Sequence, residues 1–211
     1  DDAGGAIIAW EDLRNGNFDI YTQRVNSLGV PQWTDDGVAV CTESGNQYLS
    51  SIISDGSGGA IMTWTDYRSG TYGDIYTQRI DASGNIKWTA NGLPICTEGN
   101  YQVGAPITSD GAGGAIMTWR DYRSGSTWDI YAQRINASGT TQWTANGVAV
   151  CTASGDQENP TITMDSAGGA IISWEDNRSG SPDIYAQQID QDGTLGGFPW
   201  VLFYPAILKK K

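Results

Sequence analysis

Histidine is absent from this 211-residue sequence, and its absence excludes several kinds of active site. Without imidazole there is no Ser-His-Asp triad, no histidine-ligated zinc and no histidine proton shuttle. Basic residues are also scarce: 12 Lys and Arg oppose 24 Asp and Glu, for a formal net charge of −12. A protein this acidic repels phosphate backbones, so nucleic acid is not expected as a partner.

Cysteine occurs only three times, at Cys41, Cys96 and Cys151, and the two intervals between these positions are equal. Equivalent positions in neighbouring repeats normally lie beyond the roughly 7 Å between Cα atoms that a disulfide spans. We therefore expect small, buried, apolar side chains, with a metal-binding or redox role as the alternative. The chain opens on acidic residues that lead directly into a repeat and not on a secretory leader, which indicates a mature domain or a fragment of a longer array.

Long apolar runs are also lacking. The most apolar stretch, at 198–208, is interrupted by Pro199 and Pro205. At about 11 residues it is too short to span a bilayer, which takes about 20. A strand packed on the rest of the protein is the preferred interpretation, and a membrane-surface anchor ending in the three terminal lysines is the alternative.

One phrase, repeated four times, dominates what the sequence does contain. A tryptophan closes an apolar run in each copy, and an Asp-Ile-Tyr triplet follows each time. The tryptophans are Trp10, Trp64, Trp119 and Trp174, and the triplets begin at Asp19, Asp74, Asp129 and Asp183. The step between copies is nearly constant, at about 55 residues, and a fixed period near this length is typical of repeat architectures.

Each full repeat contains four strand-like runs separated by turn residues. In the second repeat they cover residues 48–54, 60–64, 74–80 and 88–96. The runs are short and rich in β-branched and aromatic residues, and Asp-Gly and Ser-Gly turns separate them. Four antiparallel strands per unit, with units stacked face to face, predict the blades of a β-propeller.

The blade sequence also resembles a known group of proteins. The string Ser54-Asp55-Gly56-Ser57-Gly58-Gly59-Ala60-Ile61, continued to Trp64 and Asp74-Ile75-Tyr76, is similar to repeats of large secreted bacterial β-propeller proteins. Its layout also resembles TolB-like and WD-repeat-like blades. The resemblance implies an all-β propeller of four related four-stranded antiparallel blades and an extracellular or cell-surface setting. It covers about residues 1–195. The propeller repeats are assigned to residues 1–197, with blades at about 4–43, 48–98, 103–153 and 160–195.

The first of these blades lacks its own first strand. Residues 198–211 are expected to supply an apolar closing strand and a lysine tail, either as the last strand of blade four or as the missing strand of blade one. Two arrangements stay open: a closed four-bladed ring, or an incomplete array that associates with another copy through its unfinished blades.

A repeated loop face is the candidate site for a protein or carbohydrate ligand. In an up-and-down meander the loop after the second strand and the loop after the fourth strand lie at the same end of the blade. The candidate residues are Arg14, Arg68, Arg123, Arg178, Phe18, Tyr72, Trp128, Gln47, Gln102 and Gln157. Alternatives are local turn-holding by Asp-Arg pairs, packing of the aromatics on the next blade, and a calcium site between the two aspartates of a repeat.

These features predict a non-catalytic binding or scaffold module, with no catalytic residue, metal site or cofactor. Four near-equivalent blades carry abundant carboxylates, but no singular pair stands out as glycoside hydrolysis requires. The alternatives are a glycoside-acting, sialidase-like propeller enzyme and a lectin with one sugar site per blade. The turn from Ser54 to Trp64 is only loosely similar to that of sialidase blades, since its spacing to the tryptophan differs.

Overall fold

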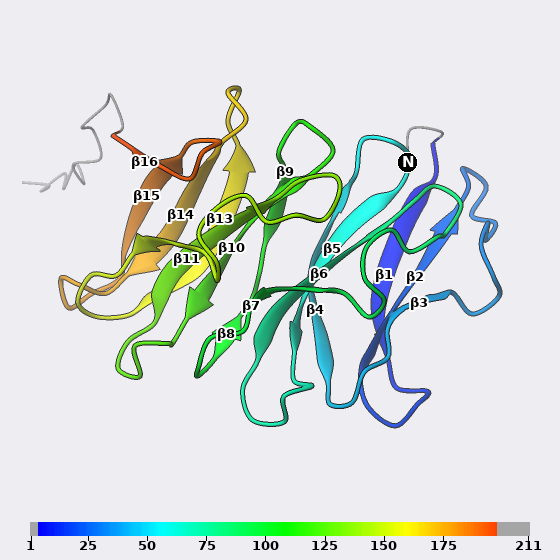
Figure 1. The fold of residues 1–211 in the computed structure, drawn as a ribbon, viewed down its shortest axis with the longest axis horizontal. Helices are drawn as coiled ribbons and strands as arrows, with labels where there is room; N and C mark the ends of the chain where they lie inside the picture. Colours follow the sequence, from blue (N-terminus) through cyan, green and yellow to red (C-terminus); the bar gives the residue numbers. More distant parts are fainter. Residues whose placement is uncertain (1–3, 198–211) are drawn as a thin grey trace, which may run out of the picture.

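A computed structural model describes residues 4–197, and every regular element within them is a β-strand. The strands form four consecutive antiparallel sheets, the blades of a β-propeller (Figure 1). The strands of blade 1 are β1 (Ala6–Asp12), β2 (Asp19–Val25) and β3 (Val38–Cys41), and those of blade 2 are β4 (Gln47–Ser54), β5 (Ala60–Asp66), β6 (Asp74–Ile80) and β7 (Leu93–Cys96). Those of blade 3 are β8 (Gln102–Val103), β9 (Ile107–Ser109), β10 (Ala115–Asp121), β11 (Asp129–Ile135) and β12 (Val148–Cys151), and those of blade 4 are β13 (Gln157–Met164), β14 (Ala170–Asp176), β15 (Asp183–Ile189) and β16 (Leu195–Gly196).

The predicted fold class, an all-β propeller of related antiparallel blades, is therefore confirmed. Blade 1 has three strands and begins with β1, as its missing first strand implies. In blade 3 the first strand is divided into β8 and β9, which both pair with β10. Gly104, with a φ of 65°, and Pro106 lie at that break. Proline removes a ladder donor and a positive φ bends the strand, so the pairing is interrupted there.

Apolar side chains on both faces of the second strand of each blade make the core. Successive residues of a strand point to opposite faces, so Ile61 of β5 packs toward blade 3 whereas Met62 packs toward blade 1. Both side chains are fully buried. Three such clusters lie between successive blades, and they hold the blades together.

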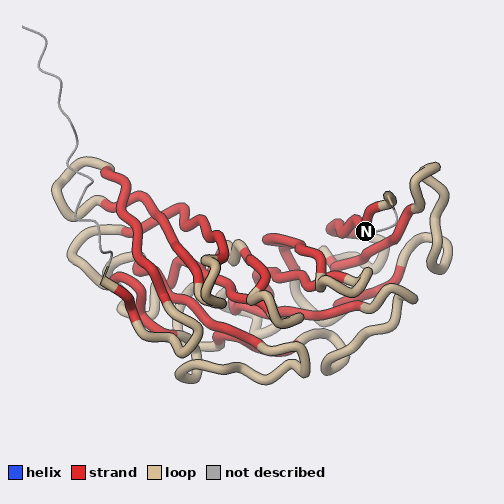
Figure 2. Tube along the Cα trace, turned by 90° about the horizontal axis from the view of Figure 1, so that it is seen from above, coloured by secondary structure: helices blue, strands red, loops and turns tan. Residues whose placement is uncertain are grey.

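The described blades form an open arc. Figure 2 shows the sheet β1–β3 at one end of a crescent and the sheet β13–β16 at the other. The first strands of neighbouring blades touch along one edge, β4 with β9 and β9 with β13. We refer to this edge as the inner edge. The predicted closing strand at 198–208 lies outside the described residues.

Candidate functional site

Each predicted arginine is held by the aspartate two residues before it. In blade 2 the carboxylate of Asp66 accepts hydrogen bonds from the backbone N–H of Arg68 at 2.9 Å, from its Nη2 at 2.6 Å and from Trp64 Nε1 at 2.8 Å. Asp66 is completely buried. The same contacts recur around Asp12, Asp121 and Asp176. These contacts are the local turn-holding arrangement that the sequence left open as an alternative.

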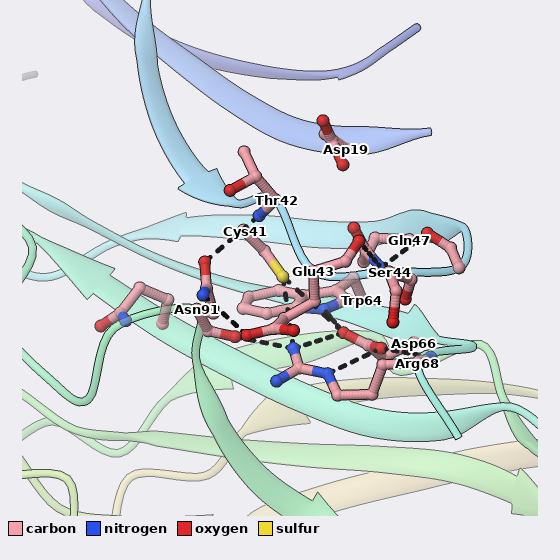
Figure 3. A network of polar contacts seen from close by, with 12 residues as sticks. Asp19, Cys41, Thr42, Glu43, Ser44, Gln47, Trp64, Asp66, Arg68 and Asn91 are labelled. Atoms are coloured by element: carbon pink, nitrogen blue, oxygen red, sulfur yellow. Dashed lines mark hydrogen bonds and ion pairs between the residues drawn. The ribbon is translucent and has the colours of Figure 1, made fainter. Parts of the chain in front are cut away.

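The arginine also joins two blades. Figure 3 shows Cys41, at the end of β3, above the pair formed by Asp66 and Arg68 of blade 2. Arg68 Nη2 lies 3.2 Å from Cys41 Sγ and donates at 2.7 Å to the carbonyl of Asn91, and the guanidinium stacks over Tyr76. Arg123 and Arg178 lie in the same position against Cys96 and Cys151.

The three thiols serve as packing groups in these junctions. All three are free, and Cys41 and Cys96 are fully buried, in agreement with the expectation of small buried side chains. Burial raises the pKa of each of these two thiols to about 12, so they stay protonated at neutral pH. Cys151 is partly exposed.

The three predicted glutamines lie at the start of the first strands and are buried. Gln47 Nε2 donates at 3.0 Å to the carbonyl of Gly45, and its backbone N–H donates at 2.7 Å to that of Phe18. Gln102 and Gln157 make the corresponding contacts. Within residues 4–197 the Oε1 atoms of these glutamines have no hydrogen-bond partner. The glutamines therefore tie the loop after the fourth strand to the preceding blade.

The predicted aromatic residues lie in the loop after the second strand, and each packs on another ring. Phe18 contacts Tyr48 and Tyr72 contacts Tyr101, both across a blade junction, at centroid distances of 5.5 and 5.0 Å. Trp128 contacts Tyr122 of its own blade at 5.0 Å. Tyr72 remains 37% exposed. Ligand binding by these rings, and by the arginines and glutamines, stays a prediction.

A second buried acidic position is formed by the aspartates of the Asp-Ile-Tyr phrase in blades 1 to 3, Asp19, Asp74 and Asp129. Burial, followed by the nearby charge of Asp66, raises the pKa of Asp74 to about 6, and burial raises that of Asp129 as well. A calcium site in this region was one alternative from the sequence. In the part of the chain that the structure describes, no group of three or more carboxylates, thiols or imidazoles is arranged to hold a metal ion.

A cluster that does not repeat lies at the inner edge between blades 3 and 4. Arg120 Nη1 pairs with Glu158 Oε1 at 3.0 Å, and its guanidinium lies 4.8 Å from the ring centre of Trp128. Glu158 is the cross-strand partner of Glu175. The repeats carry threonine and glutamate where blade 3 has Arg120, so this cluster is unique to its junction.

An open cavity of about 230 Å³ adjoins this cluster. It is lined by Val103, Gly104, Pro106, Arg120, Asn159 and Pro160. Sequence reasoning missed the cluster because Arg120 and Glu158 are far apart in the chain and come from different repeats. The signal that was available is the departure of these positions from the repeat.

Comparison with known proteins gives likeness in fold. No protein-family model and no curated protein sequence matches the chain. Among solved structures, a thermostable family-43 glycoside hydrolase matches at 11% identity over 91% of this chain and 70% of its own, with a TM-score of 0.51. The endo-arabinase of Bacteroides thetaiotaomicron matches at 16% identity over 90% and 72%, with a TM-score of 0.47. An α-L-arabinanase of Penicillium chrysogenum matches at 14% identity over 89% and 60%, with a TM-score of 0.44.

The prediction of a non-catalytic, non-enzymatic scaffold is contradicted by this comparison. The thermostable family-43 glycoside hydrolase shares this fold over 91% of the chain, so the fold gives no support to a non-catalytic role over the alternative of a glycoside-acting propeller. The physical reason is that repeated blades do not make every blade junction equivalent. Near-identical blades suggested equivalent sites, whereas the inner edge carries singular residues such as Arg120 and Glu158. Among residues 4–197 no helix is long and apolar enough to cross a membrane.

Proposed function

We propose that this chain acts on a glycoside, at the inner edge between blades 3 and 4. The observation that carries the proposal is the non-repeating cluster of Arg120, Glu158 and Trp128 beside an open cavity of about 230 Å³. The likeness in fold to a family-43 glycoside hydrolase supports the choice of chemistry. Ligand sites of this kind are concave and hold a few polar groups among apolar ones.

The residues of the cluster suit a sugar ring and its hydrolysis. The half-buried indole of Trp128 offers an apolar surface for stacking, and Arg120 offers several N–H donors. Glycoside hydrolysis commonly uses two carboxylates, one as acid and the other as base or nucleophile. Glu158 and Glu175 are the candidate pair, since they are directly opposite each other on β13 and β14.

A matched set of variants tests the proposal. The purified chain is incubated with a panel of fluorogenic glycosides, α-L-arabinofuranosides included. Glu158→Gln and Glu175→Gln are expected to lower kcat/KM by about 10²–10⁴-fold, the usual contribution of a carboxylate in proton transfer. Glu11→Gln is the control, because Glu11 holds the position of Glu175 in blade 1, and its strand β1 lies at the other end of the arc (Figure 1).

Two outcomes would contradict the proposal. One is the absence of turnover of every glycoside by the wild-type chain. The other is equal activity of the Glu158→Gln, Glu175→Gln and Glu11→Gln variants, which would remove the cluster from the reaction.

We also propose an extracellular or cell-surface setting and a TolB-like blade layout. The support for both is the resemblance of the Asp55-Gly56 turn and the Asp74-Ile75-Tyr76 phrase to secreted bacterial propeller repeats. Fractionation of cells that produce the natural protein tests the setting: recovery in the cytosol alone would contradict it.

A further inference from the structure

An indole ring seated on a glycine turn recurs at each of the three blade junctions. A Cβ placed on Gly84 of blade 2 would lie 3.0 Å from the indole of Trp33 in blade 1. The indole N–H of Trp33 donates at 3.2 Å to the carbonyl of Ala82 in the same turn. Trp88 makes this pair of contacts with Gly139 and Ala137, and Trp143 makes it with Gly193 and Gln191. Blades 2, 3 and 4 thus each receive a ring from the blade before them.

Blade 1 has the same turn at residues 26–30, and no ring from residues 4–197 lies on it. The N–H of Gly29 donates to the carbonyl of Asn26 at 2.9 Å, and the N–H of Asn26 donates to the carbonyl of Val30 at 3.0 Å. Gly84 and Asp81 make the equivalent bond in blade 2. A Cβ on Gly29 would meet nothing within 4 Å among the described residues. Leu28 and Val30, which flank the seat, are 85% and 51% exposed.

The rest of this face of blade 1 is also uncovered. Ile8 is 49% exposed, whereas the residues at its position in the later blades are fully buried against the preceding blade. These residues are Met62, Met117 and Ile172.

The opposite face of blade 4 is uncovered in the complementary way. Ile184 is 71% exposed, whereas Ile20, Ile75 and Ile130 at the same position are fully buried against the following blade. Ile171 is 36% exposed, and its equivalents Ile61 and Ile116 are fully buried. The two ends of the arc therefore present the two halves of one junction.

We propose that a second copy of this chain docks head to tail, with its blade 4 seated on blade 1. The occupant is chosen by continuity with the three internal junctions, which already pair these two faces. The surface offered to the seat is the face of blade 4 that carries Ile171 and Ile184. Such a contact is heterologous, so it builds chains of copies or a closed ring.

This contact is weaker than an internal junction. At the internal junctions an arginine donates to the same turn, as Arg79 does to Ala137 and Arg134 does to Gln191. Blade 4 carries Gln188 at this position. Its side chain makes the bond to the aspartate of its own blade, Asp165, as Arg79 does to Asp55, but it has no guanidinium to donate to a further turn. The association is therefore expected to be reversible and to depend on protein concentration.

Sedimentation velocity of the 211-residue chain, from about 1 to about 100 μM, tests the proposal. The weight-average mass is expected to rise with concentration above the 22.6 kDa of one chain. Gly29→Asn fills the seat, and asparagine tolerates the φ of 77° found there. Ile184→Glu places a charge on the opposite face. Each change is expected to raise the concentration needed for association at least tenfold.

Gly70→Asn is the control, since Gly70 also has a positive φ and open space around it but lies in a loop away from the two faces. Circular dichroism at the lowest concentration establishes that each variant is folded. A wild-type chain that stays monomeric over the whole range would overturn the proposal, as would equal association of Gly29→Asn, Ile184→Glu and Gly70→Asn. A seat used only by a further repeat or by another protein gives the first of these results.

Discussion

Replacement of one isoleucine by alanine at equivalent positions of blades 3 and 4 tests the arrangement of the arc. Ile130 and Ile184 occupy the same place in the Asp-Ile-Tyr phrase and on the third strand of their blades. Ile130 is fully buried between blades, whereas Ile184 is 71% exposed. The same chemical change is thus made in two environments that differ in burial.

The expected magnitudes follow from burial. Ile→Ala removes three carbons, worth about 2.4 kcal/mol when they are fully buried at ~0.8 kcal/mol each. The cavity left in a packed junction adds to this cost, so Ile130→Ala is expected to lower the free energy of unfolding by about 3–4 kcal/mol. At Ile184 less than a third of the side chain is covered, and the loss is expected to be about 0.7 kcal/mol or less.

Urea unfolding followed by circular dichroism provides the measurement. The protein concentration is kept at about 1 μM, below the range in which copies are expected to associate. Ile75→Ala serves as a second buried variant, because Ile75 is also fully covered. Equal losses at Ile130 and Ile184 would refute the reasoning, since they would mean that blade 4 is covered as completely as blade 3.

Three further predictions follow from the junctions. Asp66→Ala leaves Arg68 and Trp64 without their buried acceptor and is expected to lower the free energy of unfolding in urea by about 3–5 kcal/mol. Asp12→Ala, at the exposed end of the arc, is expected to lower it far less, and equal losses would contradict the role assigned to the Asp66–Arg68 pair. Because the pKa of Asp74 is raised to about 6, the folded protein holds a proton that the unfolded chain loses from about pH 4, so stability falls as pH rises through pH 4–6. Asp74→Asn is expected to remove that part of the pH dependence of the urea midpoint, and an unchanged slope would contradict it. Iodoacetamide labelling at about pH 8, followed by mass spectrometry, is expected to modify Cys151 before the buried Cys41 and Cys96, and simultaneous labelling would show that the junctions open together.

The blade architecture was predictable because local chemistry repeats. The tryptophan and Asp-Ile-Tyr steps locate the second and third strands of every blade, and the apolar residues on both sides of β5 indicate that sheets cover both faces. The division of the first strand in blade 3 was not predicted. The break depends on Gly104 and Pro106 together. The sequence pattern placed the start of the strand at Ala105 and did not indicate that Gln102 and Val103 also pair with β10.

The candidate site was less accessible to sequence reasoning because it depends on neighbours. Ile130 and Ile184 stand in the same tripeptide, so nothing local distinguishes the buried one from the exposed one. Gln47 was placed on a loop face by chain order, yet its side chain is buried because the loop carbonyls turn inward to accept from it. The Arg120–Glu158 pair forms across two blades, at an irregularity in the pairing of β13.

The ring-and-glycine junction makes the repeat an interchangeable unit. The indole donor and its carbonyl acceptor are almost equally far apart along the chain at the three junctions, with sequence separations of 49, 49 and 48. The three junctions therefore share one spacing. A duplicated or deleted unit of this length carries the glycine turn on the side of the preceding blade and the indole ring on the side of the following blade. We therefore expect that whole repeats can be added or removed without a new kind of contact at the join, so that the length of an engineered array would be set by its number of repeats.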